Sequence, residues 1–312
     1  MSSTLPEVGK RVSIKDQDKE PAMSTPTNPR REHPSTYVVQ DRSSTEELNR
    51  LQLQDQMLTA SMGGVLPEQP DVTIFQRVLD IGCGTGGWLI DVAKTYPSMS
   101  LLVGVDVSSK MIEYAQAQAE AAGVSDRVQF RAMDVLRMLE FPVNYFDLVN
   151  QRLGISYLRT WDWPKLLQEY QRVTRPGGVI RITESDIITE TNSPALLRLD
   201  QLLQQTLYQA GHLFTPERNG LTNQLGRLLR QYGFQNVQEC AFALEYRADT
   251  PEGHLFHEDM KHVYRTFVPF MRKWIPVPDD YETLYQQMLS ETQQPDFVAI
   301  WDLLTVWCNT PE

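Results

Sequence analysis

The chain has 312 residues, enough for one α/β domain of ordinary size with additional segments. Its formal net charge of −11 argues against a protein that binds a nucleic-acid backbone, because that function needs a concentrated basic surface. The sequence has no run of about 18 apolar residues, which would indicate a membrane span, and no apolar stretch typical of a secretory signal. We therefore expect a cytoplasmic protein. Its three cysteines are isolated and lack metal-type spacing, which is typical of reduced thiols: Cys83, Cys240 and Cys308.

The amino-terminal region divides into two parts. Residues 1–36 mix Ser, Thr, Pro and charged residues with almost no periodic apolar positions, so they cannot bury enough surface to offset the entropy of ordering. We expect them to form a disordered tail. Ser44 and Glu47 then make a capping box, and Leu and Met recur on one helical face until Gly63 and Gly64. This pattern predicts a helix near the start of the 37–70 segment.

A glycine-rich segment follows an apolar strand in VLDIGCGTGG, residues 78–87. Glycines let the backbone turn tightly and bring a bound molecule against main-chain N–H groups. Gly82, Gly84 and Gly87 fit the GxGxxG pattern of dinucleotide sites, whereas Gly82, Gly84 and Gly86 fit a GxGxG loop. Asp80 would repel a pyrophosphate but can hold a cationic ligand. The charge pattern therefore favours a cationic, nucleoside-like cofactor.

Acidic and polar residues also end the later predicted strands. Asp106 ends LLVGVDVSS and lies at the distance where nucleotide-binding units place the acid that accepts from ribose hydroxyls. Asp134 follows the next strand, where a carboxylate can accept from an adenine amino group. The fourth strand, FDLVNQR, ends in Asn150, Gln151 and Arg152, and RPGGVIRIT gives a turn and a fifth strand. The polar residues at the carboxyl ends of these strands therefore predict one crevice in which a ligand binds.

In this order, the segments VLDIGCGTG, GVDVS, MDV, FDLV and RPGG resemble the class I S-adenosylmethionine-dependent methyltransferases. The resemblance is strong over about residues 77–183 and weaker in the carboxyl-terminal third. VNQRLGISYL, with RPGG and ITESD, also resembles a bacterial subgroup of small-molecule methyltransferases, and more distantly fungal regulators of secondary metabolism. The resemblance implies S-adenosyl-L-methionine as cofactor. The candidate cofactor-binding residues are Tyr37, Asp80, Gly82, Cys83, Gly84, Gly86, Asp106, Val107, Met111, Asp134, Val135, Gln151 and Arg152.

Three of these candidates also have ordinary structural explanations, and for Cys83 the ordinary one is favoured. Tyr37 either contacts the cofactor or anchors the tail as an aromatic residue. Met111 either packs on the adenine or belongs to the core, and Cys83 either touches the cofactor or fills space in the loop as a small buried residue.

The predicted fold is a Rossmann-like, doubly wound α/β sheet with helical cap insertions. Family topology implies seven strands, mostly parallel, with the last strand antiparallel. Helical spacing predicts helices near 88–96, 109–122, 164–173, 193–211, 221–232, 263–274 and 281–289. An alternating pattern predicts a strand near 242–246, and an apolar segment predicts the last strand near 297–307. We divide the chain into the tail 1–36, the amino-terminal cap segment 37–70, core 71–190, cap insertion 191–220, core 221–250, cap insertion 251–295 and last core strand 296–312.

The second insertion contains HLFHEDMKH, whose histidines could share a helical face. The spacing does not match HExxH and no cysteine supplements it, so we assign no metal. An acceptor that must lose a proton would need a base, for which the candidates are His257, His262, Glu184 and Tyr157. NQRL stands where amide and planar-amine methyltransferases carry an NPPY-type signature, which disfavours such acceptors.

The sequence thus predicts an enzyme of small-molecule, secondary metabolism that methylates an O, N or C atom by in-line transfer. The aromatic and apolar cap favours a small, fairly hydrophobic acceptor. Two alternatives remain open at this point. One is a noncatalytic S-adenosylmethionine-binding regulator, and the other is an NAD-dependent oxidoreductase.

Overall fold

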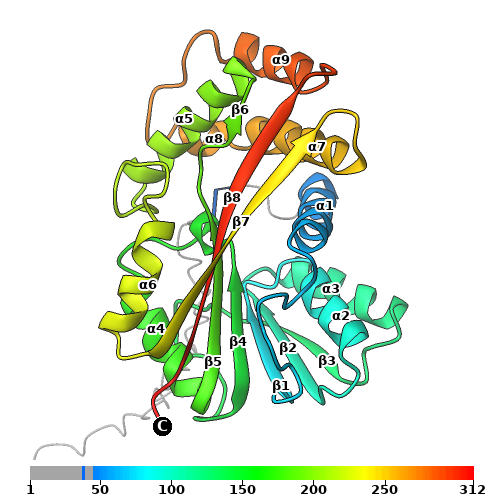
Figure 1. The fold of residues 1–312 in the computed structure, drawn as a ribbon, viewed down its shortest axis with the longest axis vertical. Coiled ribbons are helices and arrows are strands. Elements are labelled where there is room, and N and C mark those ends of the chain that lie inside the picture. The colour runs from blue at the N-terminus through cyan, green and yellow to red at the C-terminus, as the bar shows by residue number, and fades with distance from the viewer. Residues whose placement is uncertain (1–36, 39–44) are drawn as a thin grey trace, which may run out of the picture. The chain divides into compact units, whose positions relative to one another are not determined.

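One β-sheet runs through the part of the chain that the computed structural model describes, residues 37–38 and 45–312 (Figure 1). These residues fall in a compact unit formed by residues 35–312, and the predicted disordered tail lies outside them. Five parallel strands stand side by side in the order β3 (Val128–Ala132), β2 (Leu101–Asp106), β1 (Arg77–Ile81), β4 (Phe146–Arg152) and β5 (Thr174–Ser185).

The far side of β5 carries the antiparallel part of the sheet. The last strand, β8 (Val298–Asn309), runs antiparallel to β5 and also pairs with β7 (Gln235–Arg247) over its whole length. A two-residue strand, β6 (Glu190–Thr191), continues the β5 side of β8. The expected mostly parallel sheet with an antiparallel last strand is confirmed, with β6 as an addition to the seven strands.

Alternate residues of the central strands pack into two different hydrophobic clusters. In β1, Leu79 belongs to one cluster and Val78 to the other, and in β4 the neighbours Val149 and Leu148 divide in the same way. Because successive side chains of a strand point to opposite faces, both faces of the sheet are covered. The covering helices are α2 (Gly87–Thr95) and α3 (Ser109–Ala121) near β1 to β3, and α4 (Trp163–Val173) and α6 (Thr222–Gln231) near β5.

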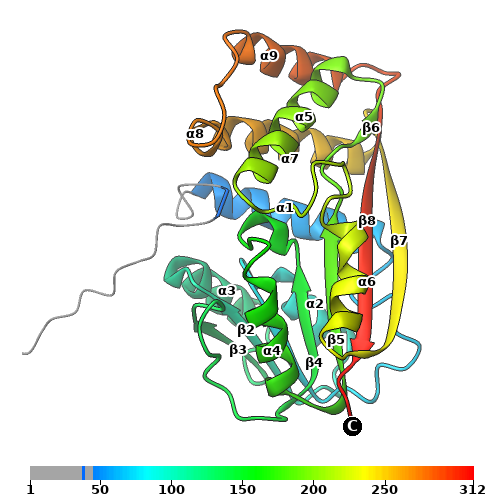
Figure 2. The same cartoon turned by 90° about the vertical axis from the view of Figure 1, so that its left-hand side faces the viewer.

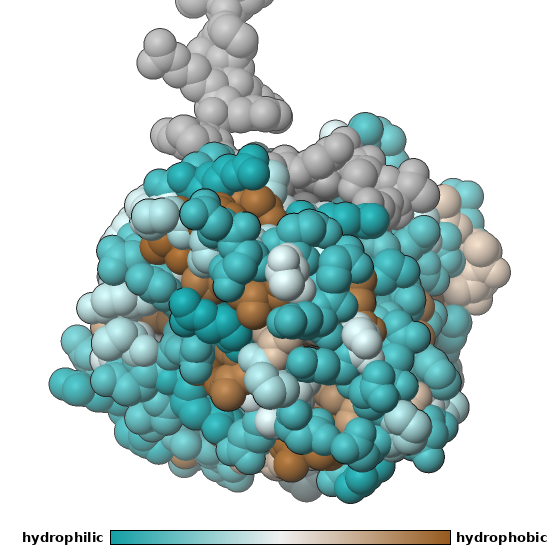
Figure 3. Space-filling view, turned by 90° about the horizontal axis from the view of Figure 1, so that it is seen from above, coloured by the Kyte–Doolittle hydropathy of each residue, from teal (hydrophilic) through white to brown (hydrophobic). Residues whose placement is uncertain are grey.

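The remaining helices gather at the end of the sheet where β7 and β8 extend beyond the other strands (Figures 1 and 2). They are α5 (Pro194–Gln209), α7 (Pro251–Thr266), α8 (Val268–Met271) and α9 (Tyr281–Glu291), which we call the helical cap. Helix α1 (Thr45–Ser61) runs between the cap and helices α2 and α3 in both views. Seen from above, the cap is mostly hydrophilic with scattered hydrophobic side chains (Figure 3). Among the residues described, no helix combines the length and apolarity that a membrane crossing requires.

One predicted helix had the wrong bounds. The segment expected to be helical at 263–274 instead contributes the end of α7, which begins at Pro251, and the short helix α8. The start of α7 is fixed by Thr250, whose hydroxyl accepts a hydrogen bond from the Gly253 N–H at 3.0 Å, and by proline in the first turn. Strand β7 is likewise longer than the predicted 242–246, because all of it pairs with β8.

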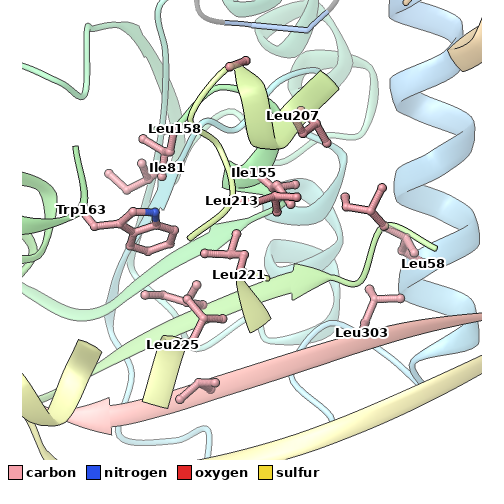
Figure 4. Close-up of a cluster of buried hydrophobic side chains, with 14 of the residues drawn as sticks. Leu58, Ile81, Ile155, Leu158, Trp163, Leu207, Leu213, Leu221, Leu225 and Leu303 are labelled. Atoms are coloured by element: carbon pink, nitrogen blue, oxygen red, sulfur yellow. The ribbon is translucent and has the colours of Figure 1, made fainter. Parts of the chain in front are cut away.

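Cap and core share one hydrophobic cluster. Leu58 of α1 and Leu303 of β8 lie at one side of the close-up in Figure 4, and Ile81 at the end of β1 lies at the other. Ile155, which follows β4, and Leu213, which follows α5, lie between them. The cap therefore packs through the same buried side chains that support the carboxyl ends of the parallel strands.

Helix α1 is also joined to the cap by buried charges. The guanidinium of Arg50 donates hydrogen bonds to Glu47 on its own helix and, at 3.2 Å, to Asp259 of α7. The Gln54 amide donates to the other oxygen of Asp259 at 3.0 Å. Asp259 and Glu47 are fully buried and Arg50 is nearly so. Removing one member of such a group leaves a charge in a poorly solvated place, which is strongly destabilising.

We therefore expect Arg50→Met to lower the free energy of unfolding by about 3 kcal/mol, because Asp259 would keep only its neutral amide partner. Urea unfolding followed by circular dichroism measures this change. Arg247→Met is the matched control, because Arg247 and its partner Glu245 are exposed, and there the loss should stay within about 0.5 kcal/mol. Equal midpoints for the two variants would contradict the importance of the Arg50 cluster.

Candidate functional site

The loop after β1 passes so close to its neighbours that only glycine fits at two positions. Gly82 and Gly86 have positive φ angles of 68° and 78°. A Cβ atom at Gly82 would lie 2.6 Å from the Tyr157 hydroxyl, and one at Gly86 would lie 2.5 Å from the Phe130 ring. At Gly84, by contrast, the nearest atom to such a Cβ belongs to Leu51 at 3.9 Å. The loop is thus packed tightly at Gly82 and Gly86 and less tightly at Gly84.

Two backbone contacts tie this loop to β2. The Cys83 N–H donates to the Val105 carbonyl at 2.9 Å, and the Gly84 N–H donates to the Asp106 carboxylate at 3.2 Å. The Cys83 sulfur packs toward Gly104, where an added Cβ would lie 2.9 Å from it. Asp106 therefore stands directly beside the glycine loop, as the sequence pattern implied for an acid facing the ribose.

Asp106 also organises the start of α3. Its second carboxylate oxygen accepts from the Ser108 N–H at 2.8 Å, and the Ser108 hydroxyl in turn caps the helix by accepting from the Met111 N–H. Met111 is 3% exposed, which shows that it packs within the protein in this state. Val107, between the acid and the cap, is 54% exposed and lies at the surface.

Asp80 lies in β1, one residue before the strand ends, and is nearly fully buried. Its carboxylate accepts a hydrogen bond of 2.7 Å from the Asn150 side chain on the neighbouring strand β4. Burial raises the pKa of Asp80 to about 7, while the nearby Arg152 charge and the Asn150 bond act in the opposite direction. A cation placed beside Asp80 would favour the ionised carboxylate.

Arg152, at the end of β4, is held by helix α1. Its guanidinium forms an ion pair with Asp55 and donates to the Thr59 hydroxyl at 3.5 Å, and it lies 5.7 Å from the Trp88 ring centroid. The Asp55 carboxylate also packs against Gly87, the first residue of α2, leaving no space for a Cβ there. The leading helix therefore reaches the glycine loop as well as the strand end.

The loop after β4 is anchored by Glu184 at the end of β5. Its carboxylate accepts from the backbone N–H groups of Gly154 at 2.8 Å and Ile155 at 3.0 Å, which belong to the short helix η1 (Gly154–Ser156). The Gln151 amide donates to the same carboxylate at 2.9 Å, and Gln151 accepts from the Tyr170 hydroxyl. Burial raises the pKa of Glu184 to about 7.

Two further cofactor candidates lie beyond β3. The Asp134 carboxylate accepts from the Leu136 N–H at 3.0 Å and pairs with Arg137 at 3.3 Å. Val135 is largely buried in the main hydrophobic cluster. The Met133 N–H donates to the Asp106 carbonyl, so this segment stays next to the end of β2.

Tyr37 lies against helix α1. Its hydroxyl donates to Glu47 at 2.8 Å, and Arg50 donates to it at 3.4 Å. Burial raises the pKa of Tyr37, and the charges of Glu47 and, more weakly, Asp106 act in the same direction. Tyr37 thus belongs to the hydrogen-bonded group that Glu47, Arg50 and Asp259 form.

The four candidate bases fall into two groups. Tyr157 contacts Gly82, and Glu184 binds the Gly154 N–H of η1, where its charge acts on Tyr157. His257 instead faces α9, where its ring bonds to the Thr292 hydroxyl at 2.7 Å and approaches Gln293 at 3.1 Å. His262, one turn further, lies beside Glu258 and Arg265 of the same helix. The structure therefore brings Tyr157 to the glycine loop, places Glu184 against the neighbouring η1, and places the two histidines in the cap.

Several partners in this site were not singled out in the sequence. Asp55 lies 97 residues from Arg152, and Asn150 was noted only as a polar strand end. The signal for Asn150 was present, since parallel strands β1 and β4 place it opposite Asp80. No comparable signal existed for Asp55, because only the packing of α1 reveals it.

Comparisons with known proteins agree on one activity. A family model described as a methyltransferase domain matches residues 78–178. The chain is 32% identical over 182 residues to a demethylmenaquinone methyltransferase of Lactiplantibacillus plantarum, covering 52% of this chain and 71% of that protein. It is 30% identical over 242 residues to the probable methyltransferase ltbC of Aspergillus luteorubrus, covering 72% of this chain and 81% of that protein.

A solved structure is similar in fold. It is a phosphoethanolamine N-methyltransferase 2 of Haemonchus contortus in complex with phosphomonomethylethanolamine and S-adenosylhomocysteine. The TM-score is 0.53 at 19% identity, and the match covers 86% of this chain and 59% of that one.

The charges and spaces of the site suit a cofactor that has a nucleoside and a positively charged sulfur. The Asp106 carboxylate lies at the Gly84 N–H, where an acid can accept from ribose hydroxyls. Asp80 supplies a buried carboxyl group in β1, two residues before Gly82.

Cofactor affinity should depend on pH through Asp80. Because its pKa in the free protein is about 7, the carboxyl is protonated below that pH and a cation must displace the proton. We expect the dissociation constant of S-adenosylmethionine to rise by up to about tenfold between pH 7 and pH 6, and to be nearly constant above pH 7.5. Isothermal titration calorimetry measures it. In Asp80→Asn the affinity should be lower at pH 8 and the slope absent; an unchanged slope would refute this role.

Asp106→Ala should weaken binding of S-adenosylhomocysteine by about 1 to 3 kcal/mol, since the ribose hydroxyls would lose a charged acceptor. Calorimetry at pH 8 gives the change. Glu120→Ala, which removes an exposed acid near the end of α3, is the control and should bind normally. An unchanged dissociation constant for Asp106→Ala would show that the ribose lies elsewhere.

Proposed function

The chain belongs to the class I S-adenosylmethionine-dependent methyltransferases, and we propose that it methylates a small, fairly hydrophobic acceptor in secondary metabolism. S-Adenosylmethionine is the cofactor of this family, and when bound it supplies a methyl group activated by attachment to a cationic sulfur. The observation that carries the proposal is the contact between Gly82 and Tyr157. It joins the cofactor loop to the loop after β4, so that an acceptor held by the second loop lies beside the first.

The proposed cofactor contacts follow the geometry of the loop. We propose that Gly82, Gly84 and Gly86 present the backbone to the cofactor, that Asp106 accepts from the ribose, and that Asp80 faces the positive end. Asp134 and Val135 would lie by the adenine, together with Val107 and Met111. Tyr37, Cys83, Gln151 and Arg152 complete the proposed set.

An apolar acceptor suits the surroundings of the loop after β4. Ile155 and Leu158 of this loop are buried in the cluster that also holds Leu58 of α1 and Leu213 (Figure 4). Such walls exclude water and leave orientation as the main contribution to an in-line displacement at carbon. The cap segments 37–70, 191–220 and 251–295 would then surround a core made of 71–190, 221–250 and 296–312.

The residues near the acceptor have distinct proposed tasks. Burial raises the pKa of the Tyr157 phenol well above its usual value, so it stays protonated near neutral pH and can donate a hydrogen bond to the acceptor. Glu184 holds η1 through two backbone N–H groups, and its pKa of about 7 lets it exchange a proton. His257 and His262 would serve as bases only if the acceptor extends into the cap.

The proposal is tested by incubating the protein with S-adenosylmethionine and a panel of phenols, quinols, hydroxy acids and aliphatic amines, and measuring S-adenosylhomocysteine and methylated product. We expect turnover with at least one hydrophobic member of the panel. Tight cofactor binding without product from any member would instead support the noncatalytic regulator.

With an acceptor in hand, Tyr157→Phe should lower kcat about 100-fold while S-adenosylhomocysteine binds with wild-type affinity, because the loss concerns the acceptor. The matched pair is His257→Gln and His262→Gln, for which we expect changes below about threefold. A large loss of activity in either histidine variant, together with wild-type activity in Tyr157→Phe, would show that a cap histidine and not Tyr157 acts on the acceptor.

A further inference from the structure

A short distance beyond Tyr157, an arginine lies between two surface tryptophans. The Arg159 guanidinium carbon is 5.3 Å from the ring centroid of Trp161 and 5.5 Å from that of Trp274 in the cap. Trp161 is 60% exposed and Trp274 is 37% exposed, so both indoles border solvent. An exposed pair of large aromatic side chains around a cation is unusual for a surface with no ligand to bind.

The Arg159 guanidinium forms no ion pair with an acid of the described residues, although the Asp162 carboxylate accepts from the Arg159 backbone N–H at 2.9 Å. Within residues 37–38 and 45–312, by contrast, Arg50, Arg152 and Arg181, for example, each have a carboxylate partner. The Nε atom of Arg159 is buried and has no hydrogen-bond partner in that part of the chain. Buried donors are nearly always paired, so an orphan donor on a cation indicates a missing acceptor.

A fully buried histidine lies beside this group. The His212 ring bonds through Nδ1 to the Ile155 carbonyl at 2.8 Å, and since a carbonyl only accepts, Nδ1 carries the proton. Its Nε2 atom has no hydrogen-bond partner among the described residues. Burial lowers the pKa of His212 to about 4, and the nearby Arg159 charge acts in the same direction. His212 is therefore neutral, and Arg159 remains the only cation of the group.

The group lies within the reach of a small acceptor. Arg159 lies two positions after Tyr157 in the chain, and two residues of chain span at most about 7 Å. Tyr157 contacts the glycine loop, and His212 touches η1 through Ile155. A molecule with a reacting atom near Tyr157 could place a polar end at Arg159 while its apolar part lies along the loop.

We propose that Arg159, flanked by Trp161 and Trp274, binds the oxyanion of the methyl acceptor, a carboxylate or a phosphate. The inference rests on the proposed function, which it narrows to hydrophobic acceptors that carry one acidic group. A planar guanidinium suits both oxyanions because it can donate two parallel hydrogen bonds. The indole faces hold the guanidinium plane and can cover the adjacent apolar part of the ligand.

The two tryptophans give a direct readout that needs no turnover. Protein saturated with S-adenosylhomocysteine is titrated with octanoate, octyl phosphate or the neutral octanamide, and tryptophan fluorescence is followed. We expect saturable changes with an anionic probe and at least tenfold weaker binding of octanamide. The stronger of the two anions identifies the oxyanion as carboxylate or phosphate.

Arg159→Gln should weaken binding of the anionic probe at least tenfold and leave octanamide unaffected. Arg159→Lys, which keeps the charge but not the paired donors, should give an intermediate value. Arg198→Gln is the matched control, since Arg198 is an exposed residue of α5. Calorimetry with S-adenosylhomocysteine should give wild-type affinity for every variant, which verifies folding.

The outcomes separate this inference from the proposed function. Equal binding of octanoate, octyl phosphate and octanamide, or wild-type anion binding by Arg159→Gln, would overturn the oxyanion site even if neutral acceptors are methylated. Arginine-dependent anion binding in a protein that methylates no member of the acceptor panel would support the site and contradict the proposed acceptor class.

Discussion

The close packing of side chains against the glycine loop is the constraint on which the pocket depends. Phe130 of β3 fills the space where Cβ atoms would stand at both Gly86 and Gly104, and Tyr157 does the same at Gly82. Any larger residue at these positions would push β2, β3 or η1 away from the loop. The result is a backbone turn with fixed surroundings, in which Gly84 is less tightly packed than Gly82 and Gly86. This turn holds Asp80, near the end of β1, and Asp106, at the end of β2, in fixed positions beside the same loop.

Helix α1, which precedes the sheet in the chain, supplies charged side chains that hold the groups near Asp80 in position. Asp55 holds Arg152 near the buried Asp80, and Arg50 on the same helix is bound to Asp259 of the cap. The spacing of Arg50 and Asp55 directs one to the cap and the other to the strand ends. A shift of α1 would therefore disturb the cofactor pocket and the cap together, which couples binding at the strand ends to the position of the cap.

The parts of this structure that local chemistry determines were predictable from the sequence. Glycine spacing, the acid at the end of β2 and the Ser108 cap each depend on a few neighbouring residues. Contacts between distant segments were not, because Asp55 and Arg152, or Arg50 and Asp259, meet only after the helices have packed. The histidine pattern illustrates the limit. Its spacing predicted a shared helical face, but only the fold shows that His257 faces α9. The candidate site residues remain proposals until variants are measured.

An acidic protein can still have a site for an acidic ligand, because the net charge of the protein and the charge of one arginine act on a ligand over different distances. A net charge of −11 disfavours a long polyanion, which must approach many parts of the surface at once. At physiological salt, however, charges more than about 8 Å from a bound group are largely screened. A single oxyanion at Arg159 would respond mainly to that guanidinium, which forms no ion pair with a carboxylate of the described residues, while the Asp162 carboxylate accepts from the Arg159 backbone N–H. The protein can thus repel polyanions and still select one acidic group close to the methyl-transfer site.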